Sequence, residues 1–179
     1  MRMYNSDGSE PEMCGNGIRC LANFVAKMDG AEPKAYKVGT LAGLIQPEVR
    51  ADGQVSVDMG EPVLDPPKVP CTFDATQDGA AVRAKMEVDG ETWLVTAVSM
   101  GNPHCVTFGK EGQCDAGGIK LDEFALSHYG PMFEKHPTFP AKTNTEFTEV
   151  VNRNYVKMHV WERGAGATLA CGTGACATV

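Results

Sequence analysis

The sequence of 179 residues has no long apolar run and no excess of basic charge. None of its apolar segments approaches the roughly 20 residues that a membrane-spanning helix needs. Lys and Arg number 16 against 23 Asp and Glu, and this formal net charge of -7 argues against a protein that coats nucleic acid phosphates. The composition favours a globular protein whose partner is a small molecule, with no membrane and no nucleic acid among its partners.

The seven cysteines are odd in number and include no Cys-x2-Cys pair. Common structural zinc sites use such pairs, so we expect no metal site. An odd set of scattered cysteines is also untypical of a disulfide framework, and it indicates a reducing compartment.

One short motif occurs twice. Cys-Gly-(Asn or Thr)-Gly stands at 14–17 and again at 171–174, each time at the start of a predicted helix. Two similar thiol sites imply an internal duplication. If the two halves face each other, a small molecule between them meets a thiol on each side, which suits moving a proton from one face of a carbon to the other.

The first motif opens a helix that we expect over 15–28. Its apolar positions fall three or four residues apart, which is typical of one buried helical face. These positions are Ile18, Leu21, Ala22, Val25 and Met28. The stretch 5–12 before it is rich in turn-forming residues and is expected to be a loop that delivers Cys14.

Two pairs of strand-like segments each flank an Asp-Gly dipeptide, which is typical of a hairpin turn. The pairs are 42–50 with 54–59, and 82–88 with 91–99. Proline has no N–H for a sheet ladder, so Pro47 is expected to restrict the first strand to an edge or a bulge.

The rest of the chain predicts further short strands and one weaker helix. The strands are expected over 105–108, 146–151 and 155–161, and the helix over 121–133, interrupted by Gly130-Pro131. Four prolines within 60–70 mark a domain boundary. We therefore expect an N-terminal domain part over 1–61 that carries Cys14 and a C-terminal domain part over 62–179 that carries Cys171.

A cysteine at a helix N-terminus can act as an acid or a base, because the unpaired helix amides favour the thiolate. The amides of Gly15, Asn16, Gly172 and Thr173 could also stabilise negative charge on a substrate carboxylate. One cysteine would then act as thiolate base and the other as thiol acid. A buried cysteine beside a Gly-x-Gly turn could equally serve packing alone.

Other polar residues could complete such a site. His104 and Glu162 are candidates for tuning the two sulfurs. A bidentate guanidinium and loop amides suit a zwitterionic ligand, and the candidates are Arg163, Asn5, Asn102 and Asn144. The alternatives are structural: His104 could be a surface histidine, Glu162-Arg163 a solvated pair, and each Asn a cap.

Four motifs together resemble the diaminopimelate epimerase family, particularly its plant and algal members. They are Asn5-x-Asp7-Gly8-Ser9-Glu10-x-x-Met13-Cys14-Gly15-Asn16-Gly17-x-Arg19-Cys20, Gly101-Asn102-Pro103-His104, Thr143-Asn144-Thr145-Glu146-Phe147, and Trp161-Glu162-Arg163-Gly164-Ala165-Gly166-x-Thr168-x-Ala170-Cys171-Gly172-Thr173-Gly174. The resemblance runs across nearly the whole chain.

The resemblance implies an α/β (α+β) fold of two pseudo-symmetric domains, each a mostly antiparallel, barrel-like sheet around a central helix. It implies interconversion of LL- and meso-diaminopimelate in lysine biosynthesis, without pyridoxal phosphate or another cofactor. Cys14 and Cys171 become the catalytic pair and His104 and Glu162 their helpers. The substrate-binding positions become Asn5, Gly15, Asn16, Asn102, Asn144, Glu162, Arg163, Gly172 and Thr173.

The resemblance also implies a plastid or cytoplasmic location and leaves a homodimer open. The family's first strands, with a His-Gly-x-Gly-Asn-Asp-Phe-like segment, and everything after the second helix begins have no counterpart in the chain, so we expect a fragment truncated at both ends. A related racemase or isomerase of the same fold is one alternative, and a ligand-binding fragment without turnover is the other.

Overall fold

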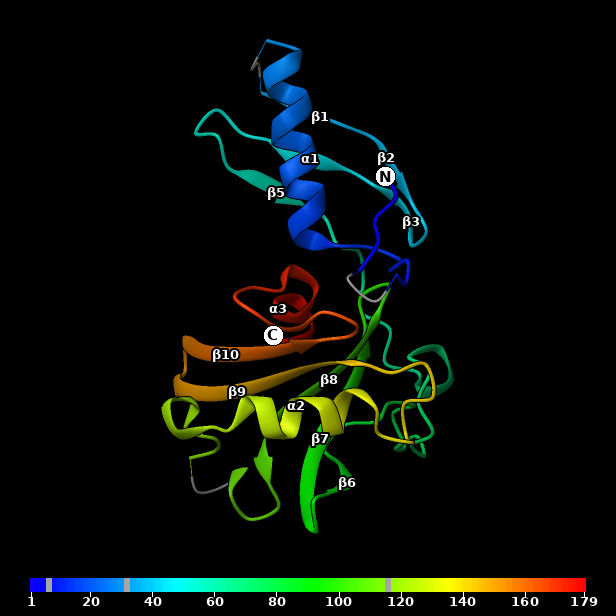
Figure 1. Cartoon of the computed structure of the whole chain (residues 1–179), viewed down its shortest axis with the longest axis vertical. Helices are drawn as coiled ribbons and strands as arrows, with labels where there is room; N and C mark the ends of the chain where they lie inside the picture. Colours follow the sequence, from blue (N-terminus) through cyan, green and yellow to red (C-terminus); the bar gives the residue numbers. More distant parts are fainter. Residues whose placement is uncertain (6–7, 31–32, 115–116) are drawn as a thin grey trace.

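The computed structural model describes residues 1–5, 8–30, 33–114 and 117–179. Within these ranges the chain forms two lobes stacked along its long axis (Figure 1). The last strand of the small lobe ends at Val57, and Val63 is the next residue that pairs with a strand, at Ser99. Ser6 and Asp7 of the predicted loop before Cys14 lie outside the described residues. None of the helices in the described ranges could span a lipid bilayer.

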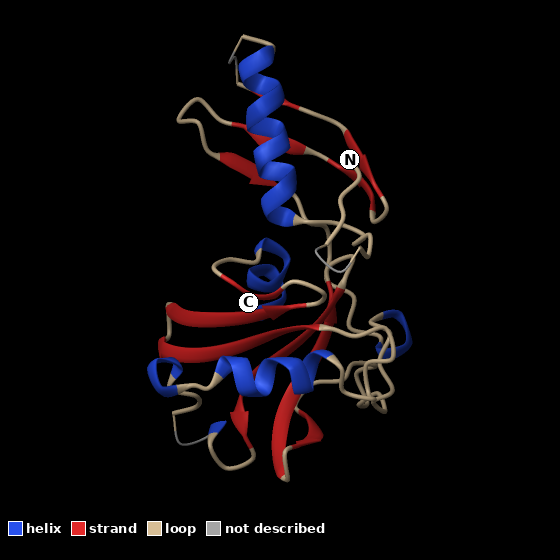
Figure 2. Cartoon of the chain, in the orientation of Figure 1, coloured by secondary structure: helices blue, strands red, loops and turns tan. Residues whose placement is uncertain are grey.

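The small lobe packs one long helix against short strands (Figure 2). As far as the chain is described, these strands form a three-stranded sheet in the order β1-β4-β5 and a separate pair, β2-β3. The elements are α1 (Gly15–Met28), β1 (Lys34–Ala35), β2 (Val38–Thr40), β3 (Gly43–Ile45), β4 (Pro47–Val49) and β5 (Val55–Val57).

Helix α1 has the predicted bounds but a slightly different buried face. Ile18, Ala22 and Ala26 are buried, and they follow one another at intervals of four residues. Ala22 and Ala26 pack against Val49 of β4, where small side chains allow the helix to approach the sheet closely. Met28, predicted on the buried face, is exposed because it lies past the end of this contact.

The first predicted hairpin forms, but its first strand is broken in two. Residues 43–45 pair with β2, whereas 47–49 pair with both β1 and β5. The expectation that Pro47 would lie at an edge or bulge is wrong, since β4 is the central strand of its sheet. Proline is tolerated there because it is the first residue of the strand, and its carbonyl still accepts the Tyr36 N–H at 2.9 Å.

The large lobe is built on one long sheet. In the described part of the chain its strands follow the order β11-β10-β9-β8-β7-β6. The elements are η1 (Pro66–Lys68), β6 (Ala84–Val88), β7 (Glu91–Ser99), β8 (Pro103–Lys110), η3 (Leu121–Glu123), α2 (Leu126–Glu134), β9 (Asn144–Asn152), β10 (Tyr155–Glu162), β11 (Gly166–Thr168) and α3 (Gly172–Thr178). The second predicted hairpin is confirmed, and it turns at Asp89-Gly90.

The pairing of β8 with β9 is parallel, and it decides where the site forms. His104 lies opposite Asn144, so the first residues of both strands reach the same edge of the sheet. Strand β10 is antiparallel to β9 and therefore ends at that edge, just before Arg163. Helix α3 begins above the same edge, between the sheet and the small lobe (Figure 1).

The main core lies between the sheet and α2. The Trp93 ring packs edge-on against Phe133 of α2 and Phe147 of β9, with ring centroids 5.1 and 6.2 Å away. The predicted interruption at Gly130-Pro131 is wrong, because α2 continues through Pro131. A proline inside a helix costs about 3 kcal/mol, and the burial of Phe133 against Trp93 offsets a cost of this size.

The predicted fold class is confirmed: helices and mostly antiparallel strands form two lobes, each with one helix that begins directly after a cysteine. The boundary expected between residues 61 and 62 stays a prediction. Val63, just beyond it, pairs with Ser99 of β7.

Gly130→Ala should destabilise the protein, although alanine usually favours a helix by about 1 kcal/mol. A Cβ at Gly130 would overlap the Trp161 indole ring, so we expect a loss of about 1–3 kcal/mol in the free energy of unfolding. Denaturant unfolding measures this, with Ser127→Ala on the exposed face of the same helix as the control. Equal stability of Gly130→Ala and the parent would contradict the packing.

Candidate active site

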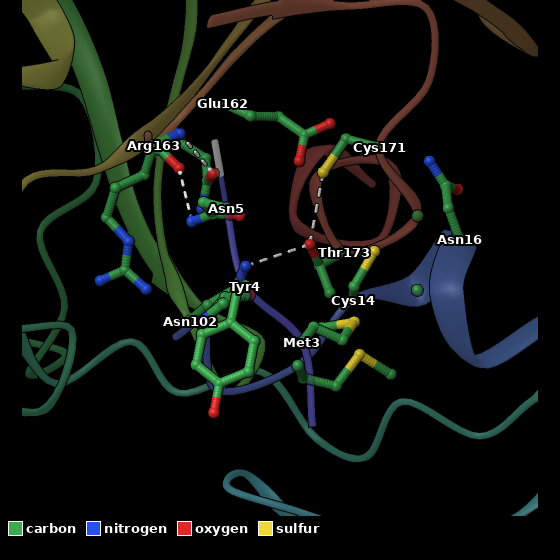
Figure 3. Close-up of a pocket in the computed structure, with 15 residues that line it drawn as sticks. Met3, Tyr4, Asn5, Cys14, Asn16, Asn102, Glu162, Arg163, Cys171 and Thr173 are labelled. Atoms are coloured by element: carbon green, nitrogen blue, oxygen red, sulfur yellow. Dashed lines mark hydrogen bonds between the residues drawn. The ribbon is translucent and has the colours of Figure 1, made fainter. Parts of the chain in front are cut away.

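A cavity of about 170 Å³ lies where the two lobes meet. Figure 3 shows that side chains from both lobes line it. Its lining residues are Met3, Tyr4, Asn5, Pro11, Met13, Cys14, Gly15, Asn16, Asn102, Asn144, Glu162, Arg163, Cys171, Gly172 and Thr173. Every residue that the sequence nominated for the site is therefore in its wall, with the exception of His104.

The two cysteines occupy the same position relative to their helices. Each is the N-cap, with φ and ψ of -138° and 113° at Cys14 and of -130° and 113° at Cys171. Each sulfur accepts the N–H of the residue three positions on, Gly17 at 3.2 Å and Gly174 at 3.3 Å. The repeated motif thus gives a repeated geometry, as a duplication would.

The starts of the two helices touch each other. A Cβ placed on Gly15 would lie 3.1 Å from the Cα of Gly172, and one placed on Gly172 would lie 3.3 Å from the Cα of Gly15. Glycine is required at both positions because two backbones pass at van der Waals distance. The N–H groups of the first helical residues, which have no partner inside a helix, thus gather from both lobes at the cavity.

The Cys171 thiol is held in its protonated form. Burial, more than any other cause, raises its pKa to about 12, and the negative charges of Glu162 and Glu146 act in the same direction. Hydrogen bonds from Thr173 and Gly174 oppose the rise only partly. Cys171 is 7% exposed, whereas Cys14 is half-buried. The two thiols therefore meet the cavity in different environments.

Glu162 ends β10 and turns its carboxylate towards the Cys171 sulfur (Figure 3). The Thr168 hydroxyl donates a hydrogen bond to it from the neighbouring strand. This contact fixes a negative charge beside the thiol and helps to keep the proton on the sulfur.

His104 lies behind the cavity wall and not in it. The side chain is completely buried, which excludes the surface alternative. Its Nδ1 is 2.7 Å from Glu146 Oε1 and its Nε2 is 2.9 Å from Asn102 Oδ1. Both ring nitrogens are thus occupied, and His104 reaches the cavity only through Asn102.

The asparagines are already engaged by the protein. The Asn144 amide donates to the Pro103 carbonyl at 2.8 Å and accepts the Arg163 N–H at 2.9 Å. Asn5 and Asn16 donate across the lobe boundary to the carbonyls of Arg163 and Ala170, at 3.3 and 2.6 Å. All three line the cavity while they also hold the backbone around it.

Arg163 spans the lobes in the same way. Its guanidinium forms an ion pair with Glu12 and donates to the Ala141 carbonyl at 3.4 Å. Figure 3 shows the guanidinium turned away from both sulfurs. A ligand carboxylate that reached this guanidinium would share it with Glu12.

Sequence reasoning missed Glu146, the carboxylate behind His104. A signal was present, since Glu146 follows Asn144 by two residues in a strand and must share its face. Within the described ranges, no group of three or more His, Cys, Asp and Glu side chains is placed to hold a metal ion.

Comparison with known proteins gives a consistent family. A family model described as diaminopimelate epimerase matches residues 1–64 and 96–179. The chain is 57% identical over 180 residues to "Diaminopimelate epimerase, chloroplastic" of Oryza sativa subsp. japonica, and it covers 50% of that relative. It is 59% identical over 181 residues to "Diaminopimelate epimerase" of Rippkaea orientalis, and it covers 61% of that one. All of this chain is matched in both cases, so the chain spans about half the length of the curated relatives.

Solved structures share the fold at much lower sequence identity. A probable proline racemase from Agrobacterium radiobacter K84, solved with bound carbonate, superposes with a TM-score of 0.60 at 13% identity over 94% of this chain and 51% of that one. A hydroxyproline epimerase from Agrobacterium vitis, with bound trans-4-OH-L-proline, gives 0.60 at 13% identity over 95% and 51%. These two comparisons show a common fold.

Alkylation of Cys171 should follow its raised pKa. Iodoacetamide reacts with the thiolate, whose fraction rises tenfold per pH unit below the pKa. The rate at Cys171 should therefore go on rising from about pH 7 to about pH 10, because its pKa lies near 12. Peptide mass spectrometry follows each cysteine separately, and the exposed Cys176 of the same helix controls for reagent access. A plateau at Cys171 within this range would contradict the raised pKa.

Proposed function

The chain belongs to the diaminopimelate epimerase family, and we propose on this basis that its cavity interconverts LL- and meso-diaminopimelate by moving one proton between two thiols. The observation that carries the proposal is the pair of cysteine N-caps that open into one cavity from two lobes. The reaction is a step of lysine biosynthesis and needs no cofactor in this proposal.

We base the direction of proton transfer on the different burial of the two sulfurs. Cys14, as thiolate, takes the proton from the α-carbon, and the electron pair left behind spreads onto the substrate carboxylate. Cys171, which holds its proton, delivers it to the opposite face. Configuration is inverted, Cys14 ends as thiol and Cys171 as thiolate, and the reverse reaction exchanges their roles.

The helix starts supply the stabilisation that a weak carbon acid needs. The amides of Gly15 and Asn16 on one lobe, and of Gly172 and Thr173 on the other, are assigned to the carboxylate of the reacting centre. Backbone amides fixed in advance stabilise the developing charge without reorganising. Glu162 holds the Cys171 thiol protonated until the carbanion forms.

The far end of diaminopimelate, with its own ammonium and carboxylate, is assigned to Asn5, Asn102, Asn144 and Arg163. Arg163 lines the cavity at that end and pairs with Glu12, which lies outside the cavity lining. We expect the substrate carboxylate to share the guanidinium with Glu12, and the loop amides to contact the remaining polar atoms. His104 acts on this arrangement through Asn102.

Two alternatives remain. A related racemase or isomerase of the same fold would use the two thiols on another amino acid. A ligand-binding chain without turnover follows if the length that the relatives have beyond this chain is needed for catalysis. The family match favours diaminopimelate over other substrates, and turnover distinguishes the second alternative.

We also propose a location in a plastid or in the cytoplasm. The rice relative is named chloroplastic, and other relatives come from Rippkaea orientalis and Synechocystis. A homodimer remains a prediction that gel filtration with light scattering would test.

Serine in place of either cysteine should remove epimerisation, because an alcohol is a far poorer base than a thiol. We expect Cys14→Ser and Cys171→Ser each to lower the rate by about 10²–10⁴-fold. Solvent deuterium entering the α-carbon of diaminopimelate measures the rate. Cys20→Ser and Cys176→Ser, both of exposed thiols, are the matched controls.

The assay is run on the 179-residue chain and on a chimaera in which the chain replaces the matching half of the rice relative. Label uptake only in the chimaera supports the proposed chemistry with a need for the additional length. No uptake in either would favour the ligand-binding alternative, and parental turnover in a Cys14→Ser chimaera would remove that residue from the mechanism.

Two thiols that converge on one carbon should also oxidise to each other. We expect mild oxidation to link Cys14 to Cys171 in a disulfide that blocks the cavity and that a reductant reverses. Mass spectrometry of unreduced peptides detects the link, and the exposed Cys20 and Cys176 serve as reference thiols for non-specific pairing. A cavity that binds ligand equally well with and without reductant would count against convergence.

A further inference from the structure

Glu146 is a completely buried carboxylate on β9, in the sheet beneath α3. A buried carboxylate is costly unless it is paired, and Glu146 has a partner at only one oxygen: Oε1 contacts His104, whereas Oε2 has no hydrogen-bond partner among the described residues. A buried carboxylate in this position therefore needs a role that offsets the cost of burying it.

The same carboxylate fixes the shape of the Cys171 motif. A Cβ at Gly174 would overlap Glu146, so the second glycine of Cys171-Gly172-Thr173-Gly174 is required by the carboxylate beneath it. The N–H of Gly174 donates to the Cys171 sulfur at 3.3 Å. Glu146 therefore lies directly under the turn that holds the thiol.

A chain of hydrogen bonds leads from Glu146 to that thiol. From His104 Nε2 the next contact is Asn102 Oδ1 at 2.9 Å. Asn102 Nδ2 then donates to Thr173 Oγ1 at 3.4 Å, and Thr173 Oγ1 is 3.4 Å from the Cys171 sulfur. Figure 3 shows the last two contacts as dashed lines. Three side chains, those of His104, Asn102 and Thr173, thus connect the buried carboxylate with a proposed catalytic atom.

Each of these hydrogen bonds has a donor and an acceptor, and the proton on His104 Nε2 determines which group donates in every one of them. Asn102 Oδ1 can only accept, so His104 Nε2 must carry a proton. With its oxygen occupied, Asn102 presents its NH₂ to Thr173, and the Thr173 hydroxyl keeps its own proton for the sulfur. If His104 Nε2 lacked a proton, the Asn102 amide would flip so that its NH₂ faced Nε2, and Thr173 would donate to Asn102 Oδ1 instead of to the Cys171 sulfur.

Glu146 selects between these two arrangements. A proton held between Glu146 Oε1 and His104 Nδ1, together with one on Nε2, makes the buried pair neutral overall. The alternative, an ionised Glu146 beside a ring protonated on Nδ1 alone, leaves a net negative charge in the core. In the neutral arrangement, each hydrogen bond from His104 through Asn102 and Thr173 is donated in the direction of the Cys171 sulfur.

We propose that Glu146 is a positioning residue for Cys171, an inference that rests on the proposed function of the two thiols. Through His104 and Asn102 it makes the Thr173 hydroxyl a donor to the sulfur. Thr173 and Gly174 then both donate hydrogen bonds to the Cys171 sulfur from the side of the helix, so the thiol proton points into the cavity. The same two donors stabilise the thiolate once that proton has left.

The first test needs no catalytic activity. In the ¹⁵N-histidine-labelled protein, long-range ¹H–¹⁵N correlation reports which ring nitrogens of His104 carry protons, and the signals that vanish in His104→Gln identify that residue. We expect a proton on Nε2. A ring protonated on Nδ1 alone would overturn the proposal, whatever the protein catalyses.

The second test compares two substitutions of the same residue. The amide of Glu146→Gln can donate to His104 Nδ1 and so preserve the direction of the chain, whereas Glu146→Leu cannot. We expect the rate of Cys171 alkylation to stay within about threefold in Glu146→Gln and to fall at least about tenfold in Glu146→Leu, the effect of a lost hydrogen bond to a thiolate. Glu149→Leu is the control: this residue of the same strand pairs with Lys120 and the Leu121 N–H, away from Cys171, so the rate of Cys171 alkylation should not change.

In the rice chimaera, the catalytic rate constant for epimerisation should follow the alkylation rate, with KM within about threefold of the parent. Equal defects in Glu146→Gln and Glu146→Leu would overturn the proposal, since bond direction would then not matter. The expected alkylation pattern without any epimerisation would support the positioning role and contradict the proposed function instead.

Discussion

The site depends on a contact between two backbones, Gly15 of α1 against Gly172 of α3. Side chains can change rotamer, but two main chains at van der Waals distance cannot move closer, so this contact limits how near the two helix starts can come. It also brings the positive ends of two helix dipoles together, which is unfavourable until an anion lies between them. The substrate carboxylate of the proposed reaction would relieve this repulsion, as would any anion held at the same place.

Polar contacts across the lobe boundary hold the two helix starts in place. Asn16 donates to the Ala170 carbonyl, Asn5 donates to the Arg163 carbonyl, and Arg163 pairs with Glu12. Residues that sequence reasoning nominated as substrate ligands therefore also join the lobes. The two roles are compatible, since a side chain that fixes the cavity wall is well placed to contact what the cavity holds.

Local signals predicted the local structure well. The spacing of apolar residues gave the bounds of α1, and Asp89-Gly90 gave the second hairpin. Where expectation failed, a longer-range contact decided. Pro47 begins a central strand because β1 and β5 pair on either side of it, and α2 passes through Pro131 because Phe133 packs against Trp93. Intrinsic propensity predicts that proline interrupts a strand or a helix, but it takes no account of the strands and side chains that pack around Pro47 and Pro131.

In the site, too, local signals were predictable from the sequence and long-range contacts were not. The repeated motif identified both cysteines and the glycines beside them, since their chemistry lies within a few consecutive residues. The burial of His104 and its partner Glu146 could not be read in this way. They are 42 residues apart in sequence, and only the parallel pairing of β8 with β9 brings them together.

The parallel pairing also makes the site sensitive to the register between β8 and β9. Side chains of a strand alternate between faces, so a slip of one residue between β8 and β9 would turn Glu146 to the face opposite His104 and would exchange core and solvent positions along the strand. A single-residue insertion early in β9 would then disconnect the thiol from the buried carboxylate while every residue type remained present. In this chain, the spacing between the motifs matters to the site as much as the motifs themselves.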